Sequence, residues 1–444
     1  MMLPCFVRVT QRLEGPALHD IPEAVRESIR SLHLQDQVRP SQTVAITAGS
    51  RGVANIDRIT RAVVDDLKAL GLTPFIVPTM GSHGEATAQG QKRILEHYGI
   101  TESAMGCPIK SSMSVVEIGK VKGTTVFCDK HAWEADHIVV VGRIKAHTDF
   151  DHEVESGLFK MMAIGLGKQH GAENYHRAGH QYSYAEVFPL VGKAVLDTGH
   201  VLFGLGIVEN GYEQTAKVKA ILPKDFYPEE SALLKEAKLW MARLPFDQID
   251  LLIVDELGKN ISGAGMDPNV TGRASVQKPA GRPQIRTLFI RDIRPESEGN
   301  AIGVGFADMT TWRLVRKINY SAMYMNAITS GAAEAVKVPM AFETDREAIH
   351  AALGINGLTP PELAQVVHIK NTLHLIEMDV SESMLDEVES HERLSRGSDP
   401  APLTFDQAGN LLPFEELFSI GPSHGRVVEE VARREQSHVS ERIR

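Results

Sequence analysis

The alternation of strand and helix patterns in the first hundred residues most constrains how this chain folds. An apolar run at 42–49 (QTVAITAG) predicts a buried strand, and apolar residues at three- and four-residue steps then predict a helix that ends at Gly71. A second apolar run at 74–80 predicts another strand, and a helix is expected at 85–98. Strand, helix, strand, helix requires parallel pairing through right-handed crossovers, so we expect an α/β fold.

The pattern continues beyond residue 100. Residues 114–128 predict two short strands around Lys122-Gly123, and 137–142 (HIVVVG) is a continuous apolar run of the kind found in sheets covered on both faces. Residues 143–182 are rich in Gly and His and show little helical periodicity outside 156–164. Helices are then expected near 183–196 and 229–243, with a strand near 201–208 between them.

A second strand–helix series starts at Asp250 (DLLIVDELG), just after Pro245-Phe246. We therefore predict two domains, 1–246 and 247–444, each a mostly parallel or mixed sheet flanked by helices, with the active site in the cleft between them. The second domain is expected to end in a charged tail. Its other predicted elements are strands near 287–291, 301–306 and 367–369, helices near 311–318, 327–336 and 345–353, and a polar linker at 391–402.

Composition excludes several classes of protein. The chain has 444 residues, 43% of them hydrophobic, and a formal net charge of 47 − 57 = −10, which argues against global disorder and against a protein that coats nucleic acid. Cys5, Cys107 and Cys128 form neither a disulfide framework nor a paired zinc motif, so the reducing cytoplasm is the expected compartment. No secretory signal is recognisable and no apolar run reaches the ~20 residues that span a bilayer, so no membrane partner is expected.

Two loops that follow the first strands carry candidate functional residues. Gly49, Ser50 and Arg51 come directly after the first strand, where small residues let the backbone approach a phosphate and Arg51 would pair with it. An ordinary turn with a surface arginine is the alternative. His83 lies between glycines after the second strand, at a place suited to acid–base chemistry, although a surface histidine would look the same.

Histidines concentrate between residues 131 and 180, which hold seven of the chain's 18. His176 and His180 are four residues apart and would share one face of a helix. Imidazole binds zinc, copper, iron and nickel, so a zinc-dependent hydrolase is one hypothesis. A solvated histidine-rich loop is the simpler interpretation of this segment. A non-enzymatic α/β protein that binds an anion or a nucleotide is a further hypothesis for the function.

Lys160 lies in the segment Ser156-Gly-Leu-Phe-Lys160, between an aromatic residue and the apolar run 161–164. Burial of an amine lowers its pKa and makes it nucleophilic. The alternative is a lysine whose amine reaches solvent.

Together these segments resemble the nickel-pincer-dependent lactate racemase family over about residues 40–210. Ser50-Arg51 matches the phosphate loop of that family, and Gly81-Ser-His83-Gly-Glu-Ala-Thr87 is similar to its first acid–base histidine motif, with one extra residue before the threonine. His147 precedes Ser156-Gly-Leu-Phe-Lys160, as the second acid–base histidine precedes the lysine of the family. His176 follows Lys160 by sixteen residues, the spacing of the histidine that ligates nickel.

The resemblance implies a racemase or epimerase of a 2-hydroxy acid that works by reversible hydride transfer. The implied cofactor is a nickel-pincer nucleotide, a pyridinium-3,5-bisthiocarboxylic acid mononucleotide with nickel. By this resemblance Lys160 tethers it, His176 binds the metal, and Gly49, Ser50 and Arg51 hold its phosphate. His83 and His147 would be the acid–base pair. Enzymes that build the cofactor are then implied as partners in maturation, and the oligomeric state is not predicted.

Three features of the sequence depart from the family pattern. Ala48 occupies the position of an aspartate three residues before the loop arginine, and the longer spacing before Lys160 leaves His152 as a competitor of His147. These departures favour a 2-hydroxy acid other than lactate. The second half matches less well, and there Lys259 and Arg273 are the expected partners of the substrate carboxylate, with surface cations in a glycine-rich turn as the alternative.

Overall fold

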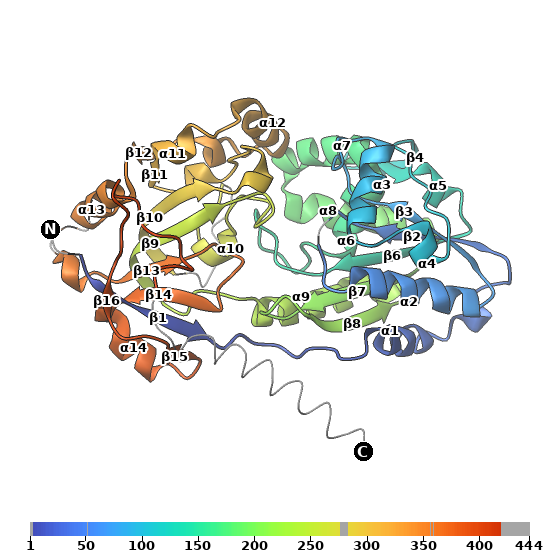
Figure 1. The fold of residues 1–444 in the computed structure, drawn as a ribbon. Coiled ribbons are helices and arrows are strands. Elements are labelled where there is room, and N and C mark those ends of the chain that lie inside the picture. Colours follow the sequence, from blue (N-terminus) through green and yellow to red (C-terminus); the bar gives the residue numbers. More distant parts are fainter. Residues whose placement is uncertain (1–2, 51, 276–282, 356, 358, 419–444) are drawn as a thin grey trace, which may run out of the picture.

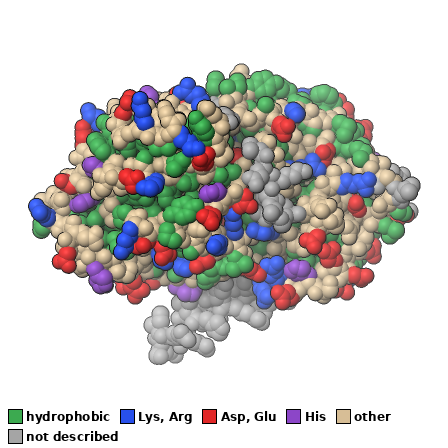
Figure 2. Space-filling view, turned by 180° about the vertical axis from the view of Figure 1, so that it is seen from behind, with side chains coloured by type: hydrophobic (Ala, Val, Ile, Leu, Met, Phe, Trp, Pro, Cys, Tyr) green, Lys and Arg blue, Asp and Glu red, His purple; other side chains and the backbone are tan. Residues whose placement is uncertain are grey.

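The computed structural model describes residues 3–50, 52–275, 283–355, 357 and 359–418. Two β-sheets, each flanked by helices, lie side by side, and the chain passes from one to the other (Figure 1). The mixed α/β class that the sequence predicts is therefore confirmed. Acidic and basic side chains are interspersed over the face drawn in Figure 2.

The first sheet has the order β3-β2-β6-β7-β8. Its strands are β2 (Thr43–Ala48), β3 (Thr73–Pro78), β6 (His137–Arg143), β7 (Val201–Glu209) and β8 (Thr215–Ile221). The first four pair in parallel, and β8 pairs antiparallel with β7. The apolar runs of β2, β3 and β6 are buried because helices cover both faces of a parallel sheet.

Helices around this sheet are amphipathic in the way the sequence predicts. In α2 (Ile56–Ala69) the buried side chains include Ile59, Val63 and Leu67, which face the sheet at three- and four-residue steps. The others are α1 (Ile21–Arg30), α3 (Ala88–His97), α7 (Leu166–Tyr182), α8 (Tyr184–Leu196) and α9 (Phe226–Trp240). Short helices are α4 (Glu102–Met105), α5 (Lys130–Trp133) and α6 (Leu158–Lys160), the last followed by a π-helical turn at Met161–Gly165.

A separate hairpin of β4 (Val115–Val121) and β5 (Thr124–Asp129) confirms the expected pair of short strands. Lys122 and Gly123 form its turn with φ of 48° and 79°. Two consecutive positive φ angles are what a tight hairpin with right-handed twist requires.

The second sheet joins strands from both ends of the chain. Its order is β12-β11-β10-β9-β13-β14-β1-β15, and β16 also pairs with β1. The central strands are β9 (Gln248–Leu257), β10 (Gln284–Ile293) and β13 (Val366–Ile369), which pair in parallel. The outer strands are β1 (Cys5–Gln11), β11 (Met309–Thr311), β12 (Met340–Phe342), β14 (Glu377–Ser381), β15 (Leu394–Arg396) and β16 (Ala401–Pro402). Its helices are α10 (Pro268–Thr271), α11 (Trp312–Val315), α12 (Tyr320–Ser330), α13 (Asp345–Ile355) and α14 (Leu385–Ser390).

The position of β1 bears on the predicted domains 1–246 and 247–444. The boundary falls just before β9, but β1 precedes the whole first sheet and pairs antiparallel with β14 and β15 of the second. A strand from the first few residues thus completes the second sheet. The division into two domains stays a prediction. The strand β1 does not follow it, because β1 falls within 1–246 but pairs with strands of the second sheet.

Two expectations for local structure are wrong. The strand expected at 301–306 is a 3₁₀ turn at Val304–Phe306, preceded by Gly303 with φ of 94°, because the backbone turns sharply there against Ala264. The polar linker expected at 391–402 instead contains β15 and β16, which cover the edge of β1.

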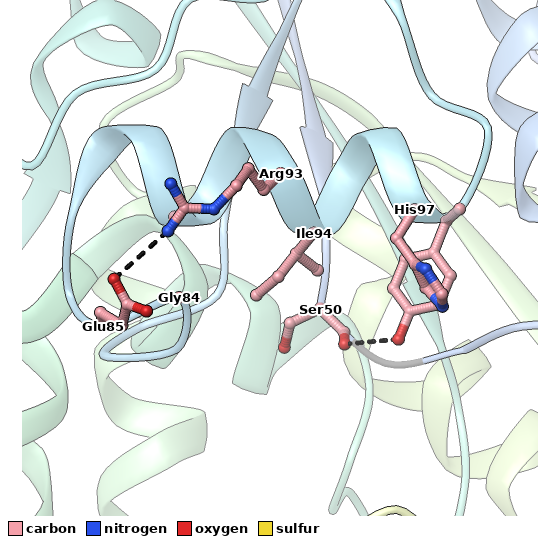
Figure 3. Close-up of a pocket in the computed structure, with 8 residues that line it drawn as sticks. Ser50, Gly84, Glu85, Arg93, Ile94 and His97 are labelled. Carbon is pink, nitrogen blue, oxygen red and sulfur yellow. Dashed lines mark hydrogen bonds and ion pairs between the residues drawn. The ribbon is translucent and has the colours of Figure 1, made fainter. Parts of the chain in front are cut away.

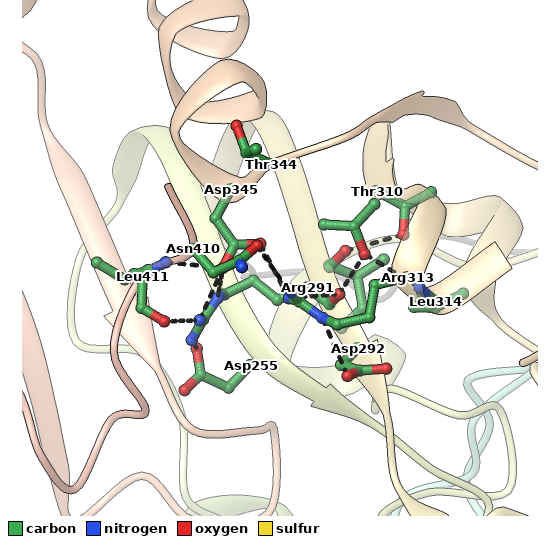
Figure 4. Close-up of polar contacts among 12 residues, drawn as sticks. Asp255, Arg291, Asp292, Thr310, Arg313, Leu314, Thr344, Asp345, Asn410 and Leu411 are labelled. Carbon is green, nitrogen blue, oxygen red and sulfur yellow. Dashed lines mark hydrogen bonds and ion pairs between the residues drawn. The ribbon is translucent and has the colours of Figure 1, made fainter. Parts of the chain in front are cut away.

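A chain of buried charges crosses the second sheet. Arg291 on β10 contacts Asp255 of β9 and Asp345 at the start of α13, and Arg313 also reaches Asp345 (Figure 4). On the other side of Asp255, His368 on β13 lies 2.6 Å from it through Nε2. These pairs satisfy charges that burial would otherwise make very costly.

His368 is the titratable centre of this chain of charges. Its Nε2 faces Asp255, and its Nδ1 lies 3.2 Å from a carboxylate oxygen of Asp379, which also binds Arg8. Burial by itself lowers the pKa of His368, but the two carboxylates outweigh it and raise the pKa to about 8. Both ring nitrogens therefore donate, and His368 is an imidazolium at neutral pH.

No helix in the described part of the chain is both long and apolar enough to cross a membrane.

We predict that His368 makes stability depend on pH above neutrality. The folded pKa of about 8 exceeds the usual 6.5, so its contribution is complete below pH 6.5 and is lost as pH rises through 8. The free energy of unfolding should fall by about 2 kcal/mol over this window. Urea denaturation at pH 6 and pH 9 measures it. His368→Gln should be less stable at pH 6 and should lose most of this slope, and an unchanged slope would contradict the assignment.

Candidate functional site

The loops that carry the predicted site residues meet at one edge of the first sheet. β2, β3 and β6 run parallel in neighbouring positions, so their carboxyl ends lie at the same edge. Gly49 and Ser50 follow β2, His83 follows β3, and His147 follows β6. Gly49 and His147 lie almost a hundred positions apart in the sequence. The parallel pairing of the strands brings their loops together.

The segment with Lys160 packs against the same loops. A methyl group added at Gly49 would lie 3.1 Å from Cε of Met161, and one at Gly81 would lie 3.0 Å from Cγ2 of Ile164. Neither glycine leaves room for a larger side chain without a shift of its neighbour. The absence of side chains at these positions lets the Lys160 segment lie directly on the ends of β2 and β3.

His83 is held by its neighbours. Its Nδ1 lies 2.5 Å from the hydroxyl oxygen of Ser50. The amide of Gln91 on α3 donates to the carbonyl oxygens of Gly81 and His83, at 2.9 and 3.2 Å. Ser50 and His83, which the sequence predicts in separate roles, are thus in direct contact. Arg51, predicted in the same loop, lies outside the described residues.

A cavity of about 340 Å³ adjoins this loop between Ser50 and α3 (Figure 3). Arg93 and His97 of α3 line it, together with Glu85, whose carboxylate pairs with Arg93 at 3.3 Å. Tyr98 also lines the cavity, and its hydroxyl donates to the carbonyl oxygen of Ser50. The cavity therefore combines two basic side chains with the backbone that follows β2.

His147 lies against Lys160. Its Nε2 is 2.6 Å from Nζ of Lys160, and the hydroxyl of Ser156 is 3.5 Å from the same amine. The ring is buried and stacks on Phe150, with centroids 4.3 Å apart at 26°. The sequence left His147 and His152 as competitors. The structure brings His147 to Lys160 and leaves the side chain of His152 exposed.

Buried acidic side chains fix the backbone around both residues. Glu155 accepts from the N–H groups of His147 and His152 at 2.6 and 2.9 Å. Glu230 on α9 accepts from the N–H groups of Leu158 and Phe159, at the start of the helical segment that carries Lys160. Burial raises the pKa of Glu230 to about 8, although these two N–H groups oppose the rise.

His176 lies on α7 and faces the same aromatic cluster as His147. Its ring meets Tyr184 edge-on at 5.5 Å and Phe188 at 6.4 Å, and the ring of His147 is also 6.4 Å from Phe188. His147 and His176 therefore both lie beside the same phenylalanine. The side chain of His180 lies outside the described part, so the expected shared face with His176 stays a prediction.

Lys168 is a site residue that the sequence did not single out. It is fully buried, and its backbone has a non-helical φ of 54° and ψ of −156° near the start of α7. Its amine lies 3.0 Å from Asp129, contacts the carbonyl oxygen of Pro78 at the end of β3, and donates to Gln91 at 3.3 Å. Burial lowers the pKa of Lys168, and Asp129 opposes this. Because Gln91 holds the His83 loop, Lys168 links that loop to α7.

The second half of the chain reaches the site through the turn that the sequence singled out. The amide of Asn269 donates to the carbonyl oxygen of His147 at 2.9 Å. The amine of Lys259 donates to Asn326 at 2.7 Å and to the carbonyl oxygen of Gly263 at 3.0 Å. Arg273 instead pairs with Asp308 and donates to the carbonyl oxygen of Phe306, so it holds loops of the second sheet together.

Metal ligands are sparse. Among the side chains that the structure describes, no three His, Cys, Asp or Glu groups gather as a metal site would require. A hydrolytic zinc centre commonly has three protein ligands. The described histidines of the stretch 131–180 do not form such a cluster.

The family model of the lactate racemase N-terminal domain matches residues 10–186. Residues 10–186 therefore belong to the lactate racemase N-terminal domain family. This range contains all of the predicted residues that meet at the edge of the first sheet. The family resemblance expected from the sequence is confirmed, and the roles of single residues stay predictions.

The chain is similar to the solved structure of the lactate racemase apoprotein from Thermoanaerobacterium thermosaccharolyticum, with 14% identity, a TM-score of 0.49, and coverage of 82% of this chain and 94% of that chain. No curated protein matches the sequence.

We predict that the Lys168–Asp129 pair is a major source of stability for the first domain. Lys168→Met leaves a buried carboxylate without its cation and should lower the free energy of unfolding by about 3–5 kcal/mol. Lys193→Met is the matched control, because its pair with Asp197 is exposed, and it should change stability by less than about 1 kcal/mol. Urea denaturation measures both. Equal losses in the two variants would show that burial of the Lys168 pair does not matter.

Proposed function

We propose that this protein is a racemase or epimerase of a 2-hydroxy acid that uses a nickel-pincer pyridinium nucleotide tethered to Lys160. The 2.6 Å approach of Lys160 Nζ to His147 Nε2, within a domain of the lactate racemase N-terminal family, carries the proposal. Lys160 offers an amine that can form a covalent bond, and His147 offers an imidazole that can transfer a proton. Acid–base chemistry on a tethered cofactor requires two such groups next to each other.

The residues present fit such a cofactor. Lys160 offers an amine for the tether, and His176 offers one imidazole, a ligand that nickel accepts. A single protein ligand is sufficient here because the thioacid arms of the nucleotide would supply the others. Phe188 and Tyr184 form an apolar aromatic surface beside His176. Gly49 and Ser50 place small residues and backbone at the strand end where a phosphate would bind.

The nucleotide, when bound, supplies a reversible hydride acceptor. His83 and His147 supply the proton chemistry, because racemisation needs a base for the hydroxyl of either enantiomer. One histidine would take the proton from the substrate hydroxyl of one enantiomer. The opposite histidine would give a proton to the oxygen when the other enantiomer forms. The position of the two histidines on separate strand-end loops supports this division.

The substrate carboxylate requires a cation. Lys259 is the better of the two predicted cations, since its turn lies next to the Asn269–His147 contact. Arg273 is engaged by Asp308 and is the weaker choice. Activity on a panel of chiral 2-hydroxy acids would identify the substrate. A cytoplasmic location and maturation by cofactor-building enzymes remain part of the proposal.

We predict a covalent adduct on Lys160. Protein produced together with the enzymes that build the nucleotide should contain about one nickel per chain, and the peptide with Lys160 should gain the mass of the cofactor. Lys160→Ala should lose the added mass. An adduct that persists in this variant would place the tether on another residue, and zinc without an organic group would favour a hydrolase.

We also predict that His83→Asn and His147→Asn each lower kcat for inversion of a chiral 2-hydroxy acid by about 10²–10⁴-fold, the usual worth of a general acid or base. Chiral chromatography of the product measures this. His152→Asn is the control, because its exposed side chain lies away from Lys160, and it should retain activity. If only His152→Asn lost activity, His152 would be the second acid–base group.

A further inference from the structure

The loop that carries His83 has a backbone that its own sequence does not favour. Gly81 and Gly84, which flank His83, have φ of 59° and 65°. Glu85 and Ala86 follow with φ of 58° and 52°. Positive φ angles are ordinary for glycine but cost free energy for residues with a side chain. Such a conformation persists only where the surrounding structure holds it, so the position of His83 depends on its neighbours.

The side chain of Gln91 on α3 holds this loop. It is fully buried, and its Nε2 donates to the carbonyl oxygens of Gly81 and His83 at 2.9 and 3.2 Å. A carbonyl oxygen only accepts, so the amide atom that faces the two carbonyls has to be the nitrogen. A methyl group added at Gly84 would lie 2.6 Å from the backbone nitrogen of Gln91, so the loop also packs directly on α3.

Lys168 fixes the other side of the Gln91 amide. Its amine donates to the amide oxygen at 3.3 Å, lies 3.0 Å from the carboxylate of Asp129, and donates to the carbonyl oxygen of Pro78. Lys168 and Asp129 are fully buried, like Gln91. Pro78 is the last residue of β3, the strand that the His83 loop follows. One buried amine therefore joins the end of β3 to the side chain that holds the loop.

The backbone of Lys168 shows that this arrangement is maintained at a cost. Its φ of 54° and ψ of −156° fall close to a region that is almost restricted to glycine. The buried bonds of the amine offset this cost. Unfavourable backbone at Lys168 and in the His83 loop thus lies at the two ends of one chain of hydrogen bonds, with Gln91 between them.

We infer that Gln91, held in place by Lys168, is a positioning residue that fixes His83 for proton transfer. The inference rests on the proposed function, in which His83 is one of the two acid–base groups. Ser50 contacts the ring of His83 at Nδ1, and Gln91 holds its backbone, so two separate segments fix the imidazole. A base has to lie within hydrogen-bond reach of the proton it takes, and a displacement of about 1 Å can cost about 10²-fold in rate.

Two substitutions of Gln91 separate positioning of His83 from support of the fold. Gln91→Met removes every bond of the amide. Gln91→Glu keeps an oxygen that accepts from Lys168 but has no N–H for the loop carbonyls. Beside the amine of Lys168 this carboxyl stays ionised, so it cannot donate in place of the amide. Gln89→Met is the matched control, because Gln89 lies on the same helix and is exposed.

Kinetics of the cofactor-loaded protein are the first measurement. Gln91→Met and Gln91→Glu should each lower kcat per bound nickel by about 10–10²-fold for inversion of a chiral 2-hydroxy acid, with KM changed less than about twofold. Gln89→Met should retain the kcat of the unaltered protein. If Gln91→Glu also retained it, Gln91 would only join α3 to Lys168, and the inference would be overturned.

The second measurement uses the full chain produced without cofactor. Labelling with ¹³C-histidine gives the NMR signal of each ring, and His83→Asn and His152→Asn assign the signals of His83 and His152. Both Gln91 variants should shift the signal of His83 and leave that of His152 unchanged, which also shows that they are folded. Gln89→Met should shift neither signal.

A signal of His83 that stays unchanged in both Gln91 variants would overturn the inference, whatever their activity. If the unaltered protein inverts no 2-hydroxy acid, the proposed function fails, and the NMR signal still decides whether Gln91 positions His83. The two failures are therefore distinguishable.

Discussion

The parallel pairing of β2, β3 and β6 is the constraint on which the candidate site depends. Their carboxyl ends lie at one edge of the sheet, and the loops after them carry Ser50, His83 and His147. Parallel strands need long connections, so residues far apart in the chain return to the same edge after each crossover. Without this pairing Ser50 and His83 would not share a hydrogen bond, and His147 would not lie beside the segment with Lys160.

Buried carboxylates then adjust the positions that the sheet provides only roughly. Glu155 and Glu230 bind backbone N–H groups of the segment that precedes Lys160, and Asp129 pairs with the amine of Lys168. Such groups are costly to bury unless their bonds are made, so they favour one backbone arrangement over its neighbours. The loops of the site are therefore more strictly positioned than surface loops usually are. The second domain contributes through Asn269, whose bond to His147 joins the two halves of the chain.

Much of the first domain could be predicted because its signals are local. Apolar runs gave the strands, and Lys122-Gly123 marked the turn of the hairpin. The helix α7 was missed, since its Gly- and His-rich sequence has weak amphipathic periodicity and its helical form depends on packing against β5 and α8. The pairing of β1 with β14 was missed for a related reason. The two strands lie about 370 residues apart in the chain, and the local sequence of a strand does not indicate which distant strand it pairs with.

By itself the sequence determined the α/β class, the identity of Lys160, His83 and His147 as chemically capable groups, and their spacing along the chain. Only the tertiary structure placed His147, and not His152, against Lys160, engaged Arg273 with Asp308, and revealed Lys168 and Glu230 as buried supports. The physical reason is that residue type fixes what a side chain can donate, accept or release. Which partner it meets, and how far water is excluded from the pair, follows from packing between segments that are distant in sequence.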